Sequence, residues 1–131
     1  MGHHQYLSTD SVFASDFIDR LINVILRASD LYDKVSRAIE VRGGTVKVLD
    51  HHIDRFYVIA IGKGSISMAK AIEDKAGDHI IDGLAVVPKG TPGKLSIIKV
   101  LESTHPLPTN KSIEAGLAIL NLLSRVRPGD Y

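Results

Sequence analysis

Apolar residues recur every three or four positions along the first third of the chain, and this spacing predicts two helices. The first covers Val12–Ala28. The second opens after Ser29-Asp30, and the glycine pair Gly43-Gly44 is expected to end it. The apolar faces hold Phe13, Phe17, Leu21, Val24, Ile25 and Ala28 in the first helix, and Leu31, Val35, Ala38 and Ile39 in the second.

Short apolar runs then predict strands. Four are expected: Thr45–Leu49, Phe56–Ile61, Gly83–Val87 and Ser96–Leu101. The second and third of these are apolar at every position, which is typical of strands covered on both faces of a sheet. Asp50–Arg55, with its adjacent histidines, is expected to be a polar turn.

Two further helices follow strands and complete an α/β pattern. One begins after Lys63 and ends at Gly77, and the other covers Asn110–Arg125. Their expected buried residues are Met68, Ala69, Ile72 and Ala76 in the first, and Ile113, Gly116, Leu117, Leu120 and Leu123 in the second. The alternation predicts a three-layer α/β sandwich with a mainly parallel, Rossmann-like sheet, preceded by two amino-terminal helices. Its crossovers should be right-handed.

Composition narrows the class of protein. The 131 residues fit one domain, and a net charge of +1 gives no basic field for a nucleic acid or an anionic membrane surface. The chain has no cysteine, and its longest apolar run is far shorter than a membrane helix. No secretory signal opens the chain, so a cytoplasmic setting is expected.

The histidines do not predict a metal site. His51 and His52 are adjacent, so in an extended segment their side chains diverge, and we interpret them as turn residues. His3 and His4 follow Met1-Gly2, a start typical of an expression leader or a disordered terminus.

The junction between the strand Phe56–Ile61 and the next helix is the clearest candidate site. Gly62, Lys63, Gly64 and Ser65 stand between them, so free backbone N–H groups, the positive end of a helix dipole and one ammonium should meet there. This combination predicts a site for a phosphate or a carboxylate. A nicotinamide site, a sugar-phosphate site and a tight turn with an exposed lysine remain alternatives, although the acidic residue of the dinucleotide fingerprint is missing from the end of the next strand.

A second candidate follows the last predicted strand. In Glu102–Pro108, two prolines separated by one residue stiffen a loop that carries His105. A rigid loop with a histidine suits ligand positioning or acid–base chemistry, and a plain connector is the equal alternative. In a parallel sheet, the ends of all these strands gather at one edge, so His105 and Lys63 are expected at the same side.

The last residues, Arg127–Tyr131, form the kind of turn that precedes a strand in this pattern. A sheet that stopped there would leave one strand without a neighbour. We therefore expect the chain to be cut short.

Taken together, four segments resemble the glycerate 2-kinase family, some members of which carry the name hydroxypyruvate reductase. The segments are Val58–Ala69, Gly83–Pro88, Glu102–Pro108 and Glu114–Gly116. They match the family's strand ending in Gly-Lys, its Met-Ala helix, its Gly-Leu-Val-Val strand, its His-Pro-x-Pro loop and its Glu-Ala-Gly helix, in order and spacing. The resemblance covers most of residues 1–131, as the amino-terminal part of such an enzyme.

The resemblance implies an ATP- and Mg²⁺-dependent transfer of a phosphoryl group to the 2-hydroxyl of D-glycerate. It places the active-site lysine at Lys63 and the loop histidine at His105, in a cleft shared with a carboxyl-terminal domain. Thr109 stands where the family has an acid, and the family's Ser-Gly-Gly-Gly loop would lie beyond Tyr131. The isolated chain is therefore expected to be inactive. A non-catalytic anion-binding module is the alternative, and whether the partner is a second domain or a second copy stays open.

Overall fold

The computed structural model describes residues 9–131, so His3 and His4 lie outside the described residues. The chain forms two compact units, one ending at Asp30 and one covering Leu31–Tyr131. In the first unit, helix α1 (Thr9–Ala28) confirms the predicted first helix. Its large apolar side chains, from Phe13 to Leu26, are exposed.

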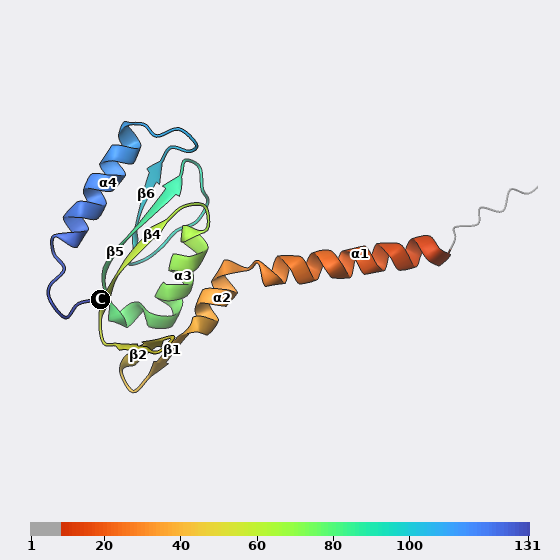
Figure 1. Cartoon of the computed structure of the whole chain (residues 1–131), viewed down its shortest axis with the longest axis horizontal. Coiled ribbons are helices and arrows are strands. Elements are labelled where there is room, and N and C mark those ends of the chain that lie inside the picture. The colour runs from red at the N-terminus through yellow and green to blue at the C-terminus, as the bar shows by residue number, and fades with distance from the viewer. Residues whose placement is uncertain (1–8) are drawn as a thin grey trace, which may run out of the picture. The chain divides into compact units, whose positions relative to one another are not determined.

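The second unit holds the other elements (Figure 1). In chain order they are α2 (Leu31–Ala38), β1 (Ile39–Arg42), β2 (Thr45–Val48), β3 (His51–Ile53), β4 (Phe56–Ile61), α3 (Ser65–Ala76), the short 3₁₀ helix η1 (Gly77–His79), β5 (Ile80–Pro88), β6 (Lys99–Ser103) and α4 (Asn110–Leu123). Among residues 9–131, no helix is long and apolar enough to cross a membrane.

A parallel sheet in the order β4-β5-β6 forms the centre of this unit. Val58 aligns with Gly83 between β4 and β5, and Val86 aligns with Leu101 between β5 and β6. The parallel pairing confirms the predicted sheet for Phe56–Ile61 and Gly83–Val87. The third strand begins at Lys99 and not at Ser96, because a carboxylate from α3 holds the backbone just before it.

Helices cover both faces of the sheet, which confirms the three-layer α/β fold (Figure 1). On the α3 face, Ala69 packs with Val58, Ala85 and Ile98. On the α4 face, the buried residues are Leu84, Val86, Ala115 and Leu122. Successive strand residues thus enter different cores, which is why these strands are apolar at nearly every position.

The predicted place of Thr45–Leu49 in the parallel sheet is wrong. These residues form β2, the middle strand of a separate antiparallel sheet with β1 and β3. Gly43 and Gly44 have φ of 59° and 80°, so they make a two-residue hairpin turn and do not end a helix. A connection this short permits only antiparallel strands. The second helix ends earlier than predicted, at Ala38.

The predicted polar turn at Asp50–Arg55 is also wrong in part. His51 aligns with Val48 and His52 with Lys47, so both histidines lie on β3. In an extended strand adjacent side chains point to opposite faces, and the two rings therefore diverge. The described residues contain no group of three His, Asp or Glu side chains that could hold a metal ion.

The predicted inner faces of the last two helices need correction. In α3, Ala69 and Ala76 are buried as predicted, but Met68 is 40% exposed. In α4, the side chains packed on the sheet are Ala115, Ala118, Ile119 and Leu122. The predicted inner residues Ile113, Leu117, Leu120 and Leu123 are exposed. Because α4 is apolar around most of its circumference, its periodicity does not identify the inner face, and the small alanines allow the closer approach.

Glu73 of α3 binds the backbone that leads into β6. One carboxylate oxygen accepts the N–H groups of Ile97 and Ile98, each at 2.7 Å, and the other accepts the N–H of Ser96 at 2.9 Å. Partial burial raises the pKa of Glu73, but the three amide hydrogen bonds, helped by the charge of Lys70, outweigh this and hold the pKa below its usual value.

We expect this carboxylate to make stability depend on pH. The native pKa of Glu73 lies below the unfolded value of about 4.3. The ionised carboxylate therefore stabilises the fold fully above that pH, and this stabilisation is lost as the pH falls through the lower native pKa. Glu73→Gln should therefore lose stability at pH 7 and show a weaker decline toward about pH 3 than the parent chain. Urea unfolding across this range measures it, with the exposed Glu114→Gln as the control. An identical pH profile for Glu73→Gln and the parent chain would contradict the assignment.

Candidate functional site

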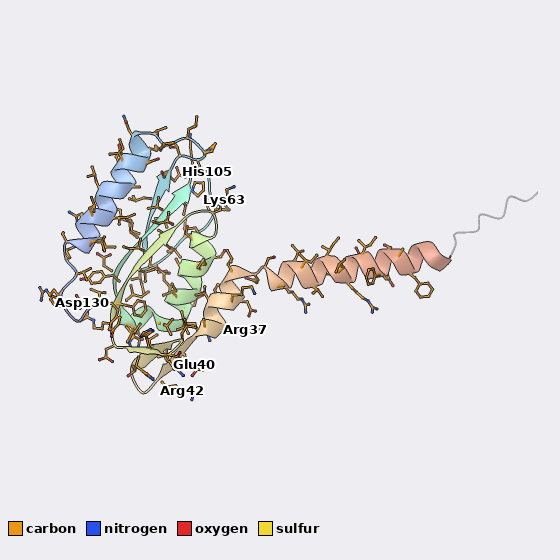
Figure 2. The ribbon with its side chains drawn as sticks, in the orientation of Figure 1. Arg37, Glu40, Arg42, Lys63, His105 and Asp130 are labelled. Carbon is orange, nitrogen blue, oxygen red and sulfur yellow. The ribbon has the colours of Figure 1, made fainter. Side chains whose placement is uncertain are left out.

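The carboxyl ends of β4, β5 and β6 surround a cavity of about 520 Å³. Lys63 enters it from the β4 end and His105 from the loop after β6, so the structure brings these two predicted residues together. Figure 2 shows both side chains at this end of the sheet. The remaining lining residues are Ile61, Gly62, Val86, Val87, Pro88, Ser103 and Thr104.

A tight turn between β4 and α3 positions Lys63. Gly62 has a φ of 108°, a conformation that favours glycine, and its N–H donates to the Val86 carbonyl at 2.9 Å. The Ser65 hydroxyl donates to the Gly62 carbonyl at 2.7 Å and closes the turn. With its flanks fixed in this way, Lys63 itself remains exposed at the cavity.

Gly64 and Ser65 do not line the cavity. Ser65 is 2% exposed, and the turn already uses its hydroxyl. A Cβ atom on Gly64 would lie 2.3 Å from Cδ1 of Leu31, so this glycine lets α2 pack closely against the start of α3. The structure thus gives both residues a packing role, and their predicted part in ligand binding stays a prediction.

The first turn of α3 has no side-chain cap. Gly64 occupies the N-cap position and has no side chain that could cap the helix, and the N–H of Ser65 donates to the Gly62 carbonyl at 3.2 Å. The loop between β5 and β6 packs beside this turn, because a Cβ on Gly93 would lie 2.4 Å from Cγ2 of Ile66. A helix amino terminus next to an ammonium suits an anion.

Hydroxyl groups anchor the loop that carries His105 at both of its ends. Thr104 and Thr109 share a hydrogen bond of 2.9 Å between their hydroxyls, and Ser103 bonds to Ser112 at 3.0 Å. The His105–Pro106 peptide bond is cis. The two hydroxyl hydrogen bonds connect the end of β6 to the start of α4 and fix the loop at the cavity.

Thr109 has a role that the sequence prediction missed. It is the N-cap of α4, and with Ser112 it forms a reciprocal capping box. A threonine followed by a polar residue three positions later, just before an apolar helix, is the sequence signal that could have found it. Thr109 thus caps α4 at the position where the glycerate 2-kinase family has an acid.

Glu102, which precedes the loop, supports the neighbouring turn. Its carboxylate accepts the N–H of Gly90 at 3.0 Å, and it does not line the cavity. The Lys89 N–H donates to the Ser103 carbonyl at 2.9 Å, which extends the pairing of β5 and β6 by one bond. Glu102 therefore holds the β5 end against β6.

The charge of the cavity favours an anion. Among the residues that the structure describes, Lys63 and His105 are the only charged or basic side chains that line it, and no carboxylate does. Mg²⁺ prefers oxygen ligands, carboxylates above all. With no cluster of three metal-binding side chains among residues 9–131, these residues do not fit a Mg²⁺ site.

A second hollow, of about 540 Å³, lies at the opposite ends of the strands. Arg55, Arg125 and Arg127 line it, but Arg125 binds the carboxylate of Asp82 at 2.7 Å. Asp82 aligns with Tyr57 near the beginning of β4, at the opposite end from the Gly62 turn, so it cannot supply the ribose-binding acid of a dinucleotide site. Among the residues that the structure describes, none at the cavity is an acid that a nicotinamide cofactor's ribose could bind.

The family model described as "Domain of unknown function (DUF4147)" matches residues 17–131. The chain belongs to this family. The match covers all of the second unit and with it every residue of the cavity.

Relatives in the family carry kinase names. The chain is 37% identical over 114 residues to a glycerate 2-kinase of Pyrococcus horikoshii, which is 85% of the chain and 26% of that protein. It is 33% identical over 108 residues to a glycerate 2-kinase of Sulfurisphaera tokodaii, 81% of the chain and 27% of the relative. These matches confirm the resemblance. The chain spans about a quarter of the length of these curated relatives.

Solved structures also show the likeness to glycerate kinases. A Pyrococcus horikoshii protein superimposes with a TM-score of 0.77 at 35% identity, over 89% of the chain and 27% of its own length. A glycerate kinase from Thermotoga maritima gives a TM-score of 0.56 at 29% identity, over 60% of the chain and 19% of its own length. At these identities the likeness extends beyond the fold to family membership.

Proposed function

We propose that this chain is the amino-terminal portion of an ATP-dependent glycerate 2-kinase. The observation that carries the proposal is the cavity at the carboxyl edge of the sheet, where Lys63 and His105 face one space without a carboxylate. Glycerate and a phosphoryl group are both anions, and this environment suits either. The names of the glycerate kinase relatives support the same substrate class.

In this proposal Lys63 is the catalytic residue. Its ammonium holds the glycerate carboxylate or the transferred phosphoryl group, whose reaction depends mainly on positioning and on neutralising charge. Gly62 shapes the turn that presents Lys63, and His105 binds substrate from the facing loop. Gly64 and Ser65 contribute through the fold of the turn. We assign no Mg²⁺ ligand and no general base to the described residues.

ATP as the phosphoryl donor and a cytoplasmic setting belong to the proposal. So does a further domain, which would complete the cleft over the cavity and supply the groups that the described residues lack. The 131 residues alone should then bind anions but not turn over ATP.

A non-catalytic anion-binding module is the second candidate. The observation in its favour is that no carboxylate lines the cavity, so no described side chain there can accept the proton of the 2-hydroxyl except His105. Such a module would bind phosphate through the same turn without recognising glycerate.

Calorimetric titration separates the two functions. D-glycerate should release heat on binding the chain, and Lys63→Ala should remove that heat. Lys47→Ala, an exposed lysine on β2 outside the cavity, should retain it. In a protein of the relatives' length that carries this segment, binding of inorganic phosphate without any binding of D-glycerate would support the module and contradict the kinase.

A further inference from the structure

Four hydroxyl groups form a connected network between the end of β6 and the start of α4. The hydroxyl oxygen of Ser112 lies 3.0 Å from that of Ser103 and 3.3 Å from that of Thr104. The Thr104 oxygen in turn lies 2.9 Å from that of Thr109. Ser103 and Thr104 line the cavity together with Lys63. The network therefore connects the first turn of α4 to the candidate site.

The backbone of α4 fixes the direction of the hydrogen bond between Thr109 and Thr104. In the capping box, the Thr109 hydroxyl oxygen accepts the N–H of Lys111 at 3.3 Å and the N–H of Ser112. A hydroxyl oxygen has two lone pairs and one proton, so these two amides occupy both lone pairs. Thr109 therefore donates its proton, and the Thr104 oxygen accepts it.

A second backbone bond limits what Ser112 can accept. Its hydroxyl oxygen accepts the N–H of Thr109 at 3.3 Å, so one lone pair and one proton remain for its two hydroxyl neighbours. Ser112 must then donate to one neighbour and accept from the other. If it donates to Ser103, the proton of Ser103 is left over. If it donates to Thr104, the proton of Thr104 is left over.

Either arrangement leaves one hydroxyl proton for the cavity. The four hydroxyls of this network have four protons, and the three hydrogen bonds that link them use three. The fourth belongs to Ser103 or Thr104, which are half-buried and line the cavity. A hydroxyl that donates to a charged oxygen makes a short, strong hydrogen bond, so this proton suits an anion beside Lys63.

We propose that Ser103 and Thr104 together provide one neutral hydrogen-bond donor to the anion in the cavity, and that Ser112 is the positioning residue that orients it. Lys63 supplies charge from the β4 end, and the hydroxyl pair supplies direction from the β6 end. Ser112 does not line the cavity and acts through its hydrogen bonds to the pair. The inference rests on the proposed anion site at Lys63.

A titration of the 131-residue chain with inorganic phosphate, followed by amide NMR at Gly62 and Lys63, tests the role of Ser112. Ser112→Ala should raise the dissociation constant for phosphate by about tenfold, the effect of losing one hydrogen bond to a charged group. Ser112→Thr keeps a hydroxyl and should recover most of the affinity. Ser124→Ala is the matched control at the other end of α4, where the Ser124 hydroxyl donates to the Asn121 carbonyl at 2.8 Å. It should leave the affinity unchanged.

A double-mutant cycle separates orientation of the donor from general support of the loop. In a chain that carries both Ser103→Ala and Thr104→Val, the donor is absent. Adding Ser112→Ala to this background should therefore raise the dissociation constant by less than about twofold. A residue that only supported the loop would cost the same factor in both backgrounds.

Two results would overturn the proposal. One is an unchanged phosphate affinity in Ser112→Ala, and the other is an equal loss on Ser112→Ala with and without the two cavity hydroxyls. In both cases Lys63→Ala should still abolish phosphate binding if the anion site is correct. Retained binding in Lys63→Ala would instead contradict the proposed function, so the two failures are distinguishable.

Discussion

Lys63→Ala is expected to lower the rate of glycerate phosphorylation by about 10²–10³-fold in a protein of the relatives' length that carries this segment. Lys63 is the only lysine or arginine that lines the cavity among the described residues, so no second side chain of this kind can replace it. The free energy of unfolding should change by less than about 0.5 kcal/mol, because Lys63 is exposed and the turn is held by Gly62 and Ser65. ATP-dependent turnover of D-glycerate and urea unfolding measure the two effects.

Two variants make this result specific. Lys63→Arg should recover only part of the rate, since a guanidinium is broader than an ammonium and the turn is narrow. Lys47→Ala should leave the rate unchanged. Full activity in Lys63→Ala would reduce the residue to an exposed turn lysine and would contradict its proposed role.

Ile98→Ala is expected to destabilise the second unit by about 2–5 kcal/mol. Ile98 is 2% exposed and packs with Val58, Ala69 and Ala85 between α3 and the sheet. It fills the space over Gly83, where an added Cβ would lie 2.9 Å from Cγ1 of Ile98. At about 4–8 °C per kcal/mol for a unit of this size, the melting temperature should fall by more than about 8 °C.

The neighbouring residue provides the control. Ile97 has the same side chain and the same kind of backbone bond to Glu73, but it is 43% exposed. Ile97→Ala should therefore cost no more than about 1 kcal/mol. Equal losses at the two positions would show that the core between α3 and the sheet is not packed around Ile98.

The parallel sheet and the β4–α3 junction could be predicted because their signals are local. Phe56–Ile61 is apolar throughout, and Gly62 marks the point where the strand ends. The antiparallel sheet was missed because Gly43-Gly44 has two interpretations: a glycine pair can end a helix or form a hairpin turn. Only the pairing of β1 with β2 distinguishes them.

Part of the candidate site could likewise be predicted from the sequence, and part could not. The rule that parallel strands end at one edge was sufficient to predict that Lys63 and His105 lie at the same cavity. The positions of Gly64 and Ser65 could not be predicted, because they depend on Leu31, far away in sequence, and on which way a serine hydroxyl turns. The inner face of α4 was missed because contacts with β5 and β6, and not the helical period, decide it.

The most direct test of the anion site is a phosphate titration of the 131-residue chain followed by amide NMR. We predict that the largest shifts fall on Gly62, Lys63 and the Ser103–His105 segment, and that Lys63→Ala abolishes them. Shifts confined to the arginine-lined hollow at Arg55, Arg125 and Arg127, or no saturable shifts around Lys63, would contradict the proposed site.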